Sequence, residues 1–183
     1  MFWKVKLKGK ITLNEHRLYV ALRQIYYLIF EAEEDIASKY GLSGQQFIVL
    51  LAMEIMSKVQ NRQIKITDLA SSLYRSVYSI STITDRMEKN GLVTKERNLS
   101  DRRVINISIT PLGHKKFIRV IKACREMLKR IFLDLSDSDF LSTISFLKTV
   151  EKNILSEPAL KKIKINSSIR NGKEIVDFIN QDI

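Results

Sequence analysis

The hydrophobic pattern of residues 66–111 changes its period once, directly after Gly91. Before that glycine, apolar side chains recur every three or four residues, as they do on one face of a helix. After it, residues 92–97 and 104–109 alternate apolar and polar side chains, as strands do. The segment is therefore predicted to form helices followed by a two-stranded hairpin, with residues 98–103 at the hairpin tip.

The helical half of this segment divides into two helices joined by a short turn. The first helix is predicted over residues 67–73, with Thr67 as its N-cap, and the turn over residues 74–76. The second is predicted over residues 77–90, and Gly91 stands where a helix end favours a residue that tolerates positive φ. The buried stripe of the second helix is expected to be Val77, Ile80, Ile83, Thr84 and Met87. A helix-turn-helix followed by a hairpin is a winged helix.

The exposed face of the second helix and the hairpin tip indicate contact with DNA. Short hydroxyl side chains can approach base edges and phosphates without an anionic barrier, and an arginine at a wing tip can enter the minor groove. The candidate DNA contacts are Ser76, Tyr78, Ser79, Thr82, Arg86, Arg102 and Arg103. The alternative for each of them is an ordinary solvated helix face or hairpin tip.

Three blocks of this chain resemble the signature of the MarR (multiple antibiotic resistance regulator) family. They are residues 85–93 (DRMEKNGLV), 101–103 (DRR) and 109–113 (ITPLG), in matching order and spacing. The resemblance covers roughly residues 14–155, and Tyr74 stands where the family often has glycine. It implies that Asp101 pairs with Arg103, which orients the guanidinium group for the minor groove.

Long apolar helices flank the winged helix on both sides. A helix is predicted from Asn14, as its cap, to about residue 39, and a capping box at Ser43 opens the next one. On the other side, Thr110 caps a helix to about residue 133, and Ser136 opens another to about residue 155. The first of these helices is too long and apolar for one small winged helix to cover. Shared burial in a dimer is expected, and the family resemblance implies it as well.

The predicted fold is therefore mainly α: a winged helix-turn-helix with a small β-hairpin wing, plus long N- and C-terminal dimerisation helices. The parts are an N-terminal arm (1–13), a dimerisation helix and core helix (14–58), the winged helix-turn-helix (59–110), C-terminal dimerisation helices (111–156) and a C-terminal extension (157–183). The N-terminal arm could form an edge strand or a flexible basic segment, and the sequence does not decide between these two interpretations. The extension is expected to pack on the dimer or on a neighbouring chain, with a disordered tail as the alternative.

The charge of the chain points to a polyanionic partner. The formal net charge is +11 over 183 residues, and much of the excess falls in and after the winged helix. Nucleic acid is the first candidate and an anionic membrane the second. Because no stretch approaches the roughly 18 apolar residues of a membrane span and the start has no secretory segment, we expect a cytoplasmic protein without a membrane partner.

The single cysteine excludes an intramolecular disulfide and a cysteine-based zinc finger. Cys124 lies on an apolar stripe, so we interpret it as a core thiol rather than a redox sensor. His16 and His114 belong to no cluster of metal-ligating residues, and His114 is interpreted as part of the basic face after the wing. No nucleotide loop, zinc motif or nucleophile elbow occurs. We therefore assign no catalytic residue, cofactor or metal, and we do not expect an enzyme.

The resemblance also implies a small-molecule effector site between the long dimer helices and the winged helix. Its candidate lining residues are Arg23, Tyr26, Tyr27, Phe30, Phe47 and Met53. Plain core packing is the alternative for each, and it is favoured because aromatic residues at helical spacing are usually part of a core.

Together these features predict a sequence-specific DNA-binding transcriptional regulator. It is expected to act as a homodimer on double-stranded DNA at a pseudo-palindromic operator, with ligand-responsive repression as the favoured mode. One alternative is an architectural protein that binds DNA without sequence preference, which the charge alone permits. The other is a protein-interaction module that uses a winged helix as its scaffold, although the arginines at the tip argue against it.

Overall fold

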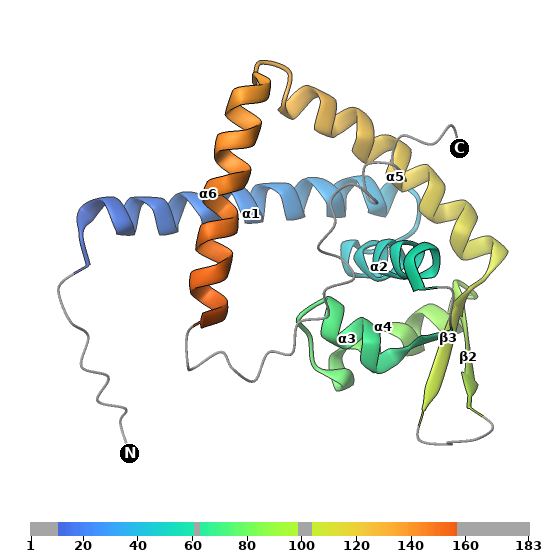
Figure 1. The fold of residues 1–183 in the computed structure, drawn as a ribbon. Coiled ribbons are helices and arrows are strands. Elements are labelled where there is room, and N and C mark those ends of the chain that lie inside the picture. Colours follow the sequence, from blue (N-terminus) through green and yellow to red (C-terminus); the bar gives the residue numbers. More distant parts are fainter. Residues whose placement is uncertain (1–10, 61–62, 99–103, 157–183) are drawn as a thin grey trace.

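The computed structural model describes residues 11–60, 63–98 and 104–156 of the chain. The elements in these ranges are, in order, α1 (Leu13–Lys39), α2 (Gly44–Gln60), β1 (Ile64–Lys65), α3 (Ile66–Ser72), α4 (Val77–Lys89), β2 (Val93–Arg97), β3 (Ile105–Ile109), α5 (Pro111–Ile131) and α6 (Asp137–Ser156) (Figure 1). The predicted fold class, mainly α with a winged helix-turn-helix, is confirmed. The predictions for the start of the arm, the hairpin tip and the C-terminal extension fall outside the described residues.

Helix α2 lies at the centre of the core, as its nearly continuous apolar sequence predicts. Phe47, Leu50 and Met53 are fully buried in it. The Phe47 ring stacks on Phe117 of α5, with 6.0 Å between the ring centroids. In Figure 1, α1 runs along one side of α2, and α3, α4 and the hairpin lie on the other. Helix α2 therefore lies between the winged helix and the long helices α1 and α5, and it contacts all of them.

The predicted caps of α2, α5 and α6 are confirmed. The Ser43 hydroxyl accepts a hydrogen bond from the Gln46 amide (3.3 Å), and the Gln46 side chain accepts one from the Ser43 amide (3.0 Å). The Thr110 hydroxyl accepts from the Gly113 amide at 3.0 Å. Ser136 forms the same reciprocal pair with Asp139. These side chains satisfy amide groups that a helix start leaves without a helical partner.

Two predicted helix starts were wrong. Helix α1 is capped by Thr12 and not by Asn14, because Thr12 and Glu15 form a complete capping box. Helix α3 begins at Ile66 with Lys65 as a cap that makes no side-chain hydrogen bond, so Thr67 lies inside the helix. Here the helix follows directly from a strand, and the burial of Ile66 places the start.

The sheet has three antiparallel strands in the order β1-β3-β2. The predicted hairpin pairs Val93 with Ile109 and Arg97 with Ile105. Strand β1 was not predicted, since residues 59–65 had been interpreted as a polar link. It is only two residues long and pairs Ile64 with Ile107, which is too short to give a period-two pattern. Its effect is to hold the edge of the wing against the end of α2.

Helices α1 and α6 leave most of their apolar side chains in solvent in the single chain. Ala37 is the buried residue of α1, and α6 has none. Figure 1 shows that α5 leads from the α2 core to the connection that precedes α6. The exposed apolar side chains include Leu18, Tyr19, Ile25 and Leu28 of α1 and Leu141, Ile144, Phe146 and Leu147 of α6.

Candidate nucleic-acid interface

The turn between α3 and α4 has a left-handed residue although that residue is a tyrosine. Tyr74 has a φ of +53°, a conformation that glycine adopts readily and bulky residues rarely adopt. The turn closes through a hydrogen bond of 2.9 Å from the Arg75 amide to the Ala70 carbonyl. The helix-turn-helix therefore keeps a tight turn at the position where a glycine would be expected.

One face of α4 is anchored in the core. Ile80, Ile83, Thr84 and Met87 are buried, as the periodicity of the sequence predicted. Val77 was predicted to join them, but its side chain is 48% exposed. It occupies the first position of the helix, directly after the turn, where α4 has not yet entered the core. The remaining stripe sets the rotation of α4 about its own axis.

The opposite face of α4 carries the predicted DNA-contacting residues of the helix. Tyr78 is 83% exposed, and Arg86 is exposed as well. The Ser76 hydroxyl accepts a hydrogen bond from the Ser79 amide at 3.1 Å and so caps the helix. The Thr82 hydroxyl donates to the Tyr78 carbonyl at 3.0 Å. Ser76 and Thr82 thus serve the helix itself, while Tyr78 and Arg86 extend furthest into solvent.

An ion pair that sequence reasoning missed connects α4 to the wing. The Lys95 ammonium group of β2 pairs with the Asp85 carboxylate of α4. The Lys95 amide also donates to the Glu88 carboxylate at 3.1 Å. Two side chains one helical turn apart therefore hold β2 against α4. The alternation of residues 92–97 could indicate a strand but not the helix on which that strand packs.

The last described residues of the hairpin bring its two strands together. The Asn98 amide donates to the Val104 carbonyl at 2.9 Å, directly beyond the pairing of Arg97 with Ile105. Arg102, Arg103 and Asp101 lie outside the described residues. Their roles at the tip stay predictions.

The sequence model of the MarR family matches residues 58–105. This range runs from the end of α2 through the helix-turn-helix and β2 to the first residue of β3. Over this segment the chain is similar to the MarR family. Two of the three sequence blocks that resemble MarR proteins, residues 85–93 and 101–103, lie inside the matched range, and the third follows it.

Characterised and uncharacterised MarR-like regulators are similar over most of the chain. It is 27% identical over 119 residues to the uncharacterized HTH-type transcriptional regulator YsmB of Bacillus subtilis (strain 168), covering 65% of this chain and 78% of that protein. It is 23% identical over 124 residues to the HTH-type transcriptional repressor MdtR of the same organism, covering 68% and 77%. The organohalide-sensing regulator RdhR-CbdbA1625, in its 2,4-dichlorophenol-bound crystal structure, matches with a TM-score of 0.72 at 20% identity, over 90% of this chain and 96% of that one. This last likeness concerns the MarR fold.

The six candidate effector residues occupy different environments in this chain. Phe47 takes a core position against Phe117. Tyr26 lines a pocket of about 250 Å³ between α1, α2 and the helix-turn-helix, and Met53 lines a separate one. The others lie along α1. There Arg23 donates to the hydroxyl groups of Tyr19 (3.0 Å) and Tyr27 (2.6 Å), and Phe30 stacks on Tyr26.

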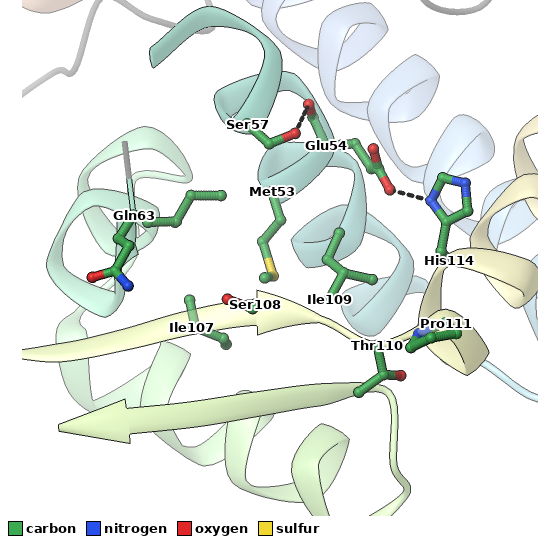
Figure 2. Close-up of a pocket in the computed structure, with 11 residues that line it drawn as sticks. Met53, Glu54, Ser57, Gln63, Ile107, Ser108, Ile109, Thr110, Pro111 and His114 are labelled. Atoms are coloured by element: carbon green, nitrogen blue, oxygen red, sulfur yellow. Dashed lines mark hydrogen bonds and ion pairs between the residues drawn. The ribbon is translucent and has the colours of Figure 1, made fainter. Parts of the chain in front are cut away.

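The pocket that Met53 lines has a volume of about 700 Å³ and lies between α2, β1, β3 and the first turn of α5 (Figure 2). His114 was interpreted as part of the basic surface after the wing; its side chain is half exposed there and also lines this pocket. Its Nδ1 atom lies 2.6 Å from Oε1 of Glu54, a carboxylate that is almost wholly buried. The sequence signal that could have indicated this site is an acidic residue within the apolar run of α2.

Cys124 is a core residue of α5, as predicted. Its side chain is buried, and burial raises the pKa of the thiol to about 12, with a further contribution from the Glu33 carboxylate. The thiol is therefore protonated at neutral pH. In the described part of the chain, no three metal-ligating side chains gather where they could hold an ion. None of the helices in the same ranges is long and apolar enough to cross a bilayer.

Proposed function

We propose that this chain is a sequence-specific, DNA-binding transcriptional regulator of the MarR family that acts as a homodimer. The observation that carries the proposal is the two-sided construction of α4. Its apolar face is buried, Lys95 ties it to the wing, and Tyr78 and Arg86 are left free on the outer face. A helix held in this way can enter a major groove without giving up contacts that stabilise the fold.

The DNA contacts divide into two groups. On α4, Ser76, Tyr78, Ser79, Thr82 and Arg86 contact bases and phosphates. At the wing tip, Arg102 and Arg103 reach the adjacent minor groove, and Asp101 pairs with Arg103. A pure hydroxyl surface discriminates bases weakly, since a good bidentate contact contributes about 1–3 kcal/mol and a single hydroxyl contributes less. Groove shape is therefore expected to add to specificity.

The homodimer is supported by the apolar surface of the two outer helices. Leu28 of α1 and Leu141 of α6 are each about 70% exposed in the single chain (70% and 72%). Side chains of this kind, repeated along two helices, are typical of an interface and not of a free surface. A two-fold dimer places its two α4 helices on half-sites roughly 34–36 Å apart along the DNA.

The mode of regulation that we propose is repression relieved by a small molecule. The relative MdtR is named as a transcriptional repressor, and the fold neighbour RdhR-CbdbA1625 is described as sensing organohalides. An effector weakens DNA binding only if it binds a dimer geometry with wrongly spaced α4 helices more tightly than the DNA-binding geometry. The pocket beside Tyr26 borders α1 and the helix-turn-helix, so an occupant there would contact both.

The proposal is tested by fluorescence anisotropy with a duplex from the chain's own upstream region and a scrambled duplex of equal length. A specific regulator prefers the first duplex by a factor of roughly 10³ or more, and its affinity falls steeply with salt because phosphate contacts release counterions. Equal affinity for both duplexes, and for a genomic library of fragments, would favour the architectural alternative. No binding to any DNA would favour the interaction module.

The wing assignment has a sharper test. Arg103→Ala should lower affinity for the specific duplex by at least about tenfold, because it removes a charge from the minor groove. Lys148→Gln, an exposed change on α6 far along the chain from the winged helix, is the control for loss of one positive charge. Unchanged affinity of the Arg103 variant would remove this residue from the interface.

A further inference from the structure

The pocket behind the wing is a separate cavity from the one beside Tyr26. Its lining comes from four elements: α2, β1, β3 and α5 (Figure 2). At about 700 Å³, it falls within the size range of small-molecule sites.

The described lining combines one buried carboxylate with an apolar wall. Glu54 projects from α2 toward His114, and Met53, Ile107 and Ile109 form the apolar side (Figure 2). Although lysine and arginine make up 31 of the chain's 183 residues, neither type is among the described lining residues. Glu54 is their one acidic member. The charge of this described lining is thus opposite in sign to that of the whole chain.

We infer that this pocket binds a small amphipathic organic cation, an amine carried on an apolar body, whose ammonium group pairs with Glu54. The apolar body lies along Met53, Ile107 and Ile109. A buried carboxylate needs a paired donor, and the His114 Nδ1 atom lies 2.6 Å from Oε1 of Glu54. The His114 side chain is half exposed, so its ring can turn into solvent when an ammonium group takes its place.

An organic anion fits the same pocket poorly. It would have to approach the Glu54 carboxylate, and two carboxylates that share one site repel each other. The Thr110 hydroxyl donates to the Gly91 carbonyl at 2.6 Å while it caps α5. The Thr110 hydroxyl is therefore not available to an anion, and His114 faces the carboxylate that repels one.

Occupancy of this pocket should also alter DNA binding, a consequence that rests on the proposed function. Strand β3 ends at Ile109 and α5 begins at Pro111, so Thr110 alone joins them. An occupant that contacts α2 on one side and the β3–α5 junction on the other changes the angle between the wing and the core. The pocket therefore couples to the wing through the backbone of β3.

The test uses three probes of similar shape and different charge: 2-phenylethylamine, 2-phenylethanol and 3-phenylpropionate. Binding is followed by the ring C–H signals of histidine in ¹H–¹³C NMR spectra. The chain has two histidines, so His114→Gln assigns the signal of His114 and leaves His16 as an internal reference. The amine should shift the His114 signal saturably, with affinity at least tenfold above that of the alcohol or the acid.

Two variants of equal net charge test the role of Glu54 by calorimetry. Glu54→Gln keeps the shape of the side chain and should lower affinity for the amine at least tenfold. Asp134→Asn removes a carboxylate from the exposed connection between α5 and α6 and should leave the affinity unchanged. His114→Gln should still bind the amine, because the carboxylate remains. The comparison of the three probes on the unaltered chain does not depend on the folding of any variant.

Several outcomes would overturn the inference. They are tighter binding of the acid than of the amine, equal binding of the amine by Glu54→Gln, and an unshifted His114 signal with all three probes. The coupling is tested separately, by measuring DNA affinity with and without the amine for the unaltered chain and for Glu54→Gln. If the chain bound no DNA, the proposed function would fail, while the NMR and calorimetric results would still decide the binding site.

Discussion

Two glycines at the base of the wing are required for different physical reasons. An ideal Cβ atom on Gly113 would lie 2.1 Å from the Leu92 carbonyl oxygen, a contact that no flexible side chain can relieve. A Cβ atom on Gly91 would have enough room, because its nearest neighbour would lie at 3.8 Å, an ordinary van der Waals distance. The φ of Gly91, however, is +67°. Space therefore limits the first position, and backbone conformation limits the second.

Alanine substitution at each glycine should separate these effects. Gly113→Ala should lower the free energy of unfolding by about 2–3 kcal/mol, because the first turn of α5 must move away from Leu92. Gly91→Ala should lower it by about 1 kcal/mol, since only the left-handed conformation is disfavoured. Urea unfolding followed by circular dichroism measures both. Gly91→Asn is the control, because asparagine tolerates this conformation better, and an equal loss at all positions would contradict the distinction.

Cys124 makes the stability of the fold depend on alkaline pH. Burial raises the pKa of its thiol from 9.0 to about 12 in the folded chain. The unfolded chain therefore releases the thiol proton at lower pH than the folded chain does. The stability that Cys124 contributes is fully present below pH 9 and is lost as the pH rises from 9 toward about 12.

Urea unfolding at a series of pH values should show this loss directly. The free energy of unfolding of the unaltered chain should fall more steeply above pH 9 than that of Cys124→Ala. The folded thiol should also react with iodoacetamide much more slowly than the thiol of the urea-unfolded chain at the same pH, since the thiolate is the reactive form. Parallel pH profiles of the two proteins, or equal alkylation rates, would show that the thiol ionises as readily in the folded state.

At the scale of the element, α4 combines two independent roles on opposite faces. Ile80 is buried against the core, and Tyr78, two residues before it, is 83% exposed. Tyr78→Ala should therefore leave the unfolding free energy within about 0.5 kcal/mol and lower affinity for specific DNA by roughly tenfold. Ile80→Ala should lower the unfolding free energy by about 2–5 kcal/mol. Paired urea titrations and anisotropy measurements check both, and a large stability loss in the Tyr78 variant would show that its ring supports the fold.

The elements themselves were largely predictable because their signals are local. The change of period after Gly91, the reciprocal pair of Ser43 with Gln46, and Thr110 followed by proline each place a boundary within a few residues. Thr12 was missed as a cap because Asn14 also fits the first helix start. Strand β1 was missed because a two-residue strand exists only through its partner Ile107.

The candidate site was less predictable, because its geometry depends on residues far apart in the chain. Glu54 and His114 are 60 positions apart, and only the packing of α5 on α2 brings them together. The ion pair between Lys95 and Asp85 depends in the same way on the packing of β2 on α4. The surface of α4 could be predicted, since periodicity alone separates a buried helical face from an exposed one.

For the whole molecule, the outer helices should decide the state of association. Leu141→Glu places a charge at a side chain that is 72% exposed in the single chain, where a dimer would bury it. This variant should sediment as a monomer at concentrations at which the unaltered chain is a dimer, and it should lose most of its affinity for a two-half-site duplex. Lys148→Gln on the same helix changes the net charge by the same amount and is the control for charge. A dimeric Leu141 variant, measured by analytical ultracentrifugation, would place the interface elsewhere.

The one-residue connection between β3 and α5 couples any rotation of α5 to the orientation of the wing. Helix α5 has 21 residues and is therefore roughly 31 Å long at about 1.5 Å per residue. The wing is joined to α5 through Thr110 alone, and Gly113 in the first turn of α5 packs closely on the Leu92 carbonyl at the base of the wing. The wing and α5 therefore have little freedom to move relative to each other. A tilt of about 10° displaces the far end of such a helix by roughly 5 Å. Small rotations between two subunits would thus change the orientation of the wing, because no flexible linker separates the wing from α5.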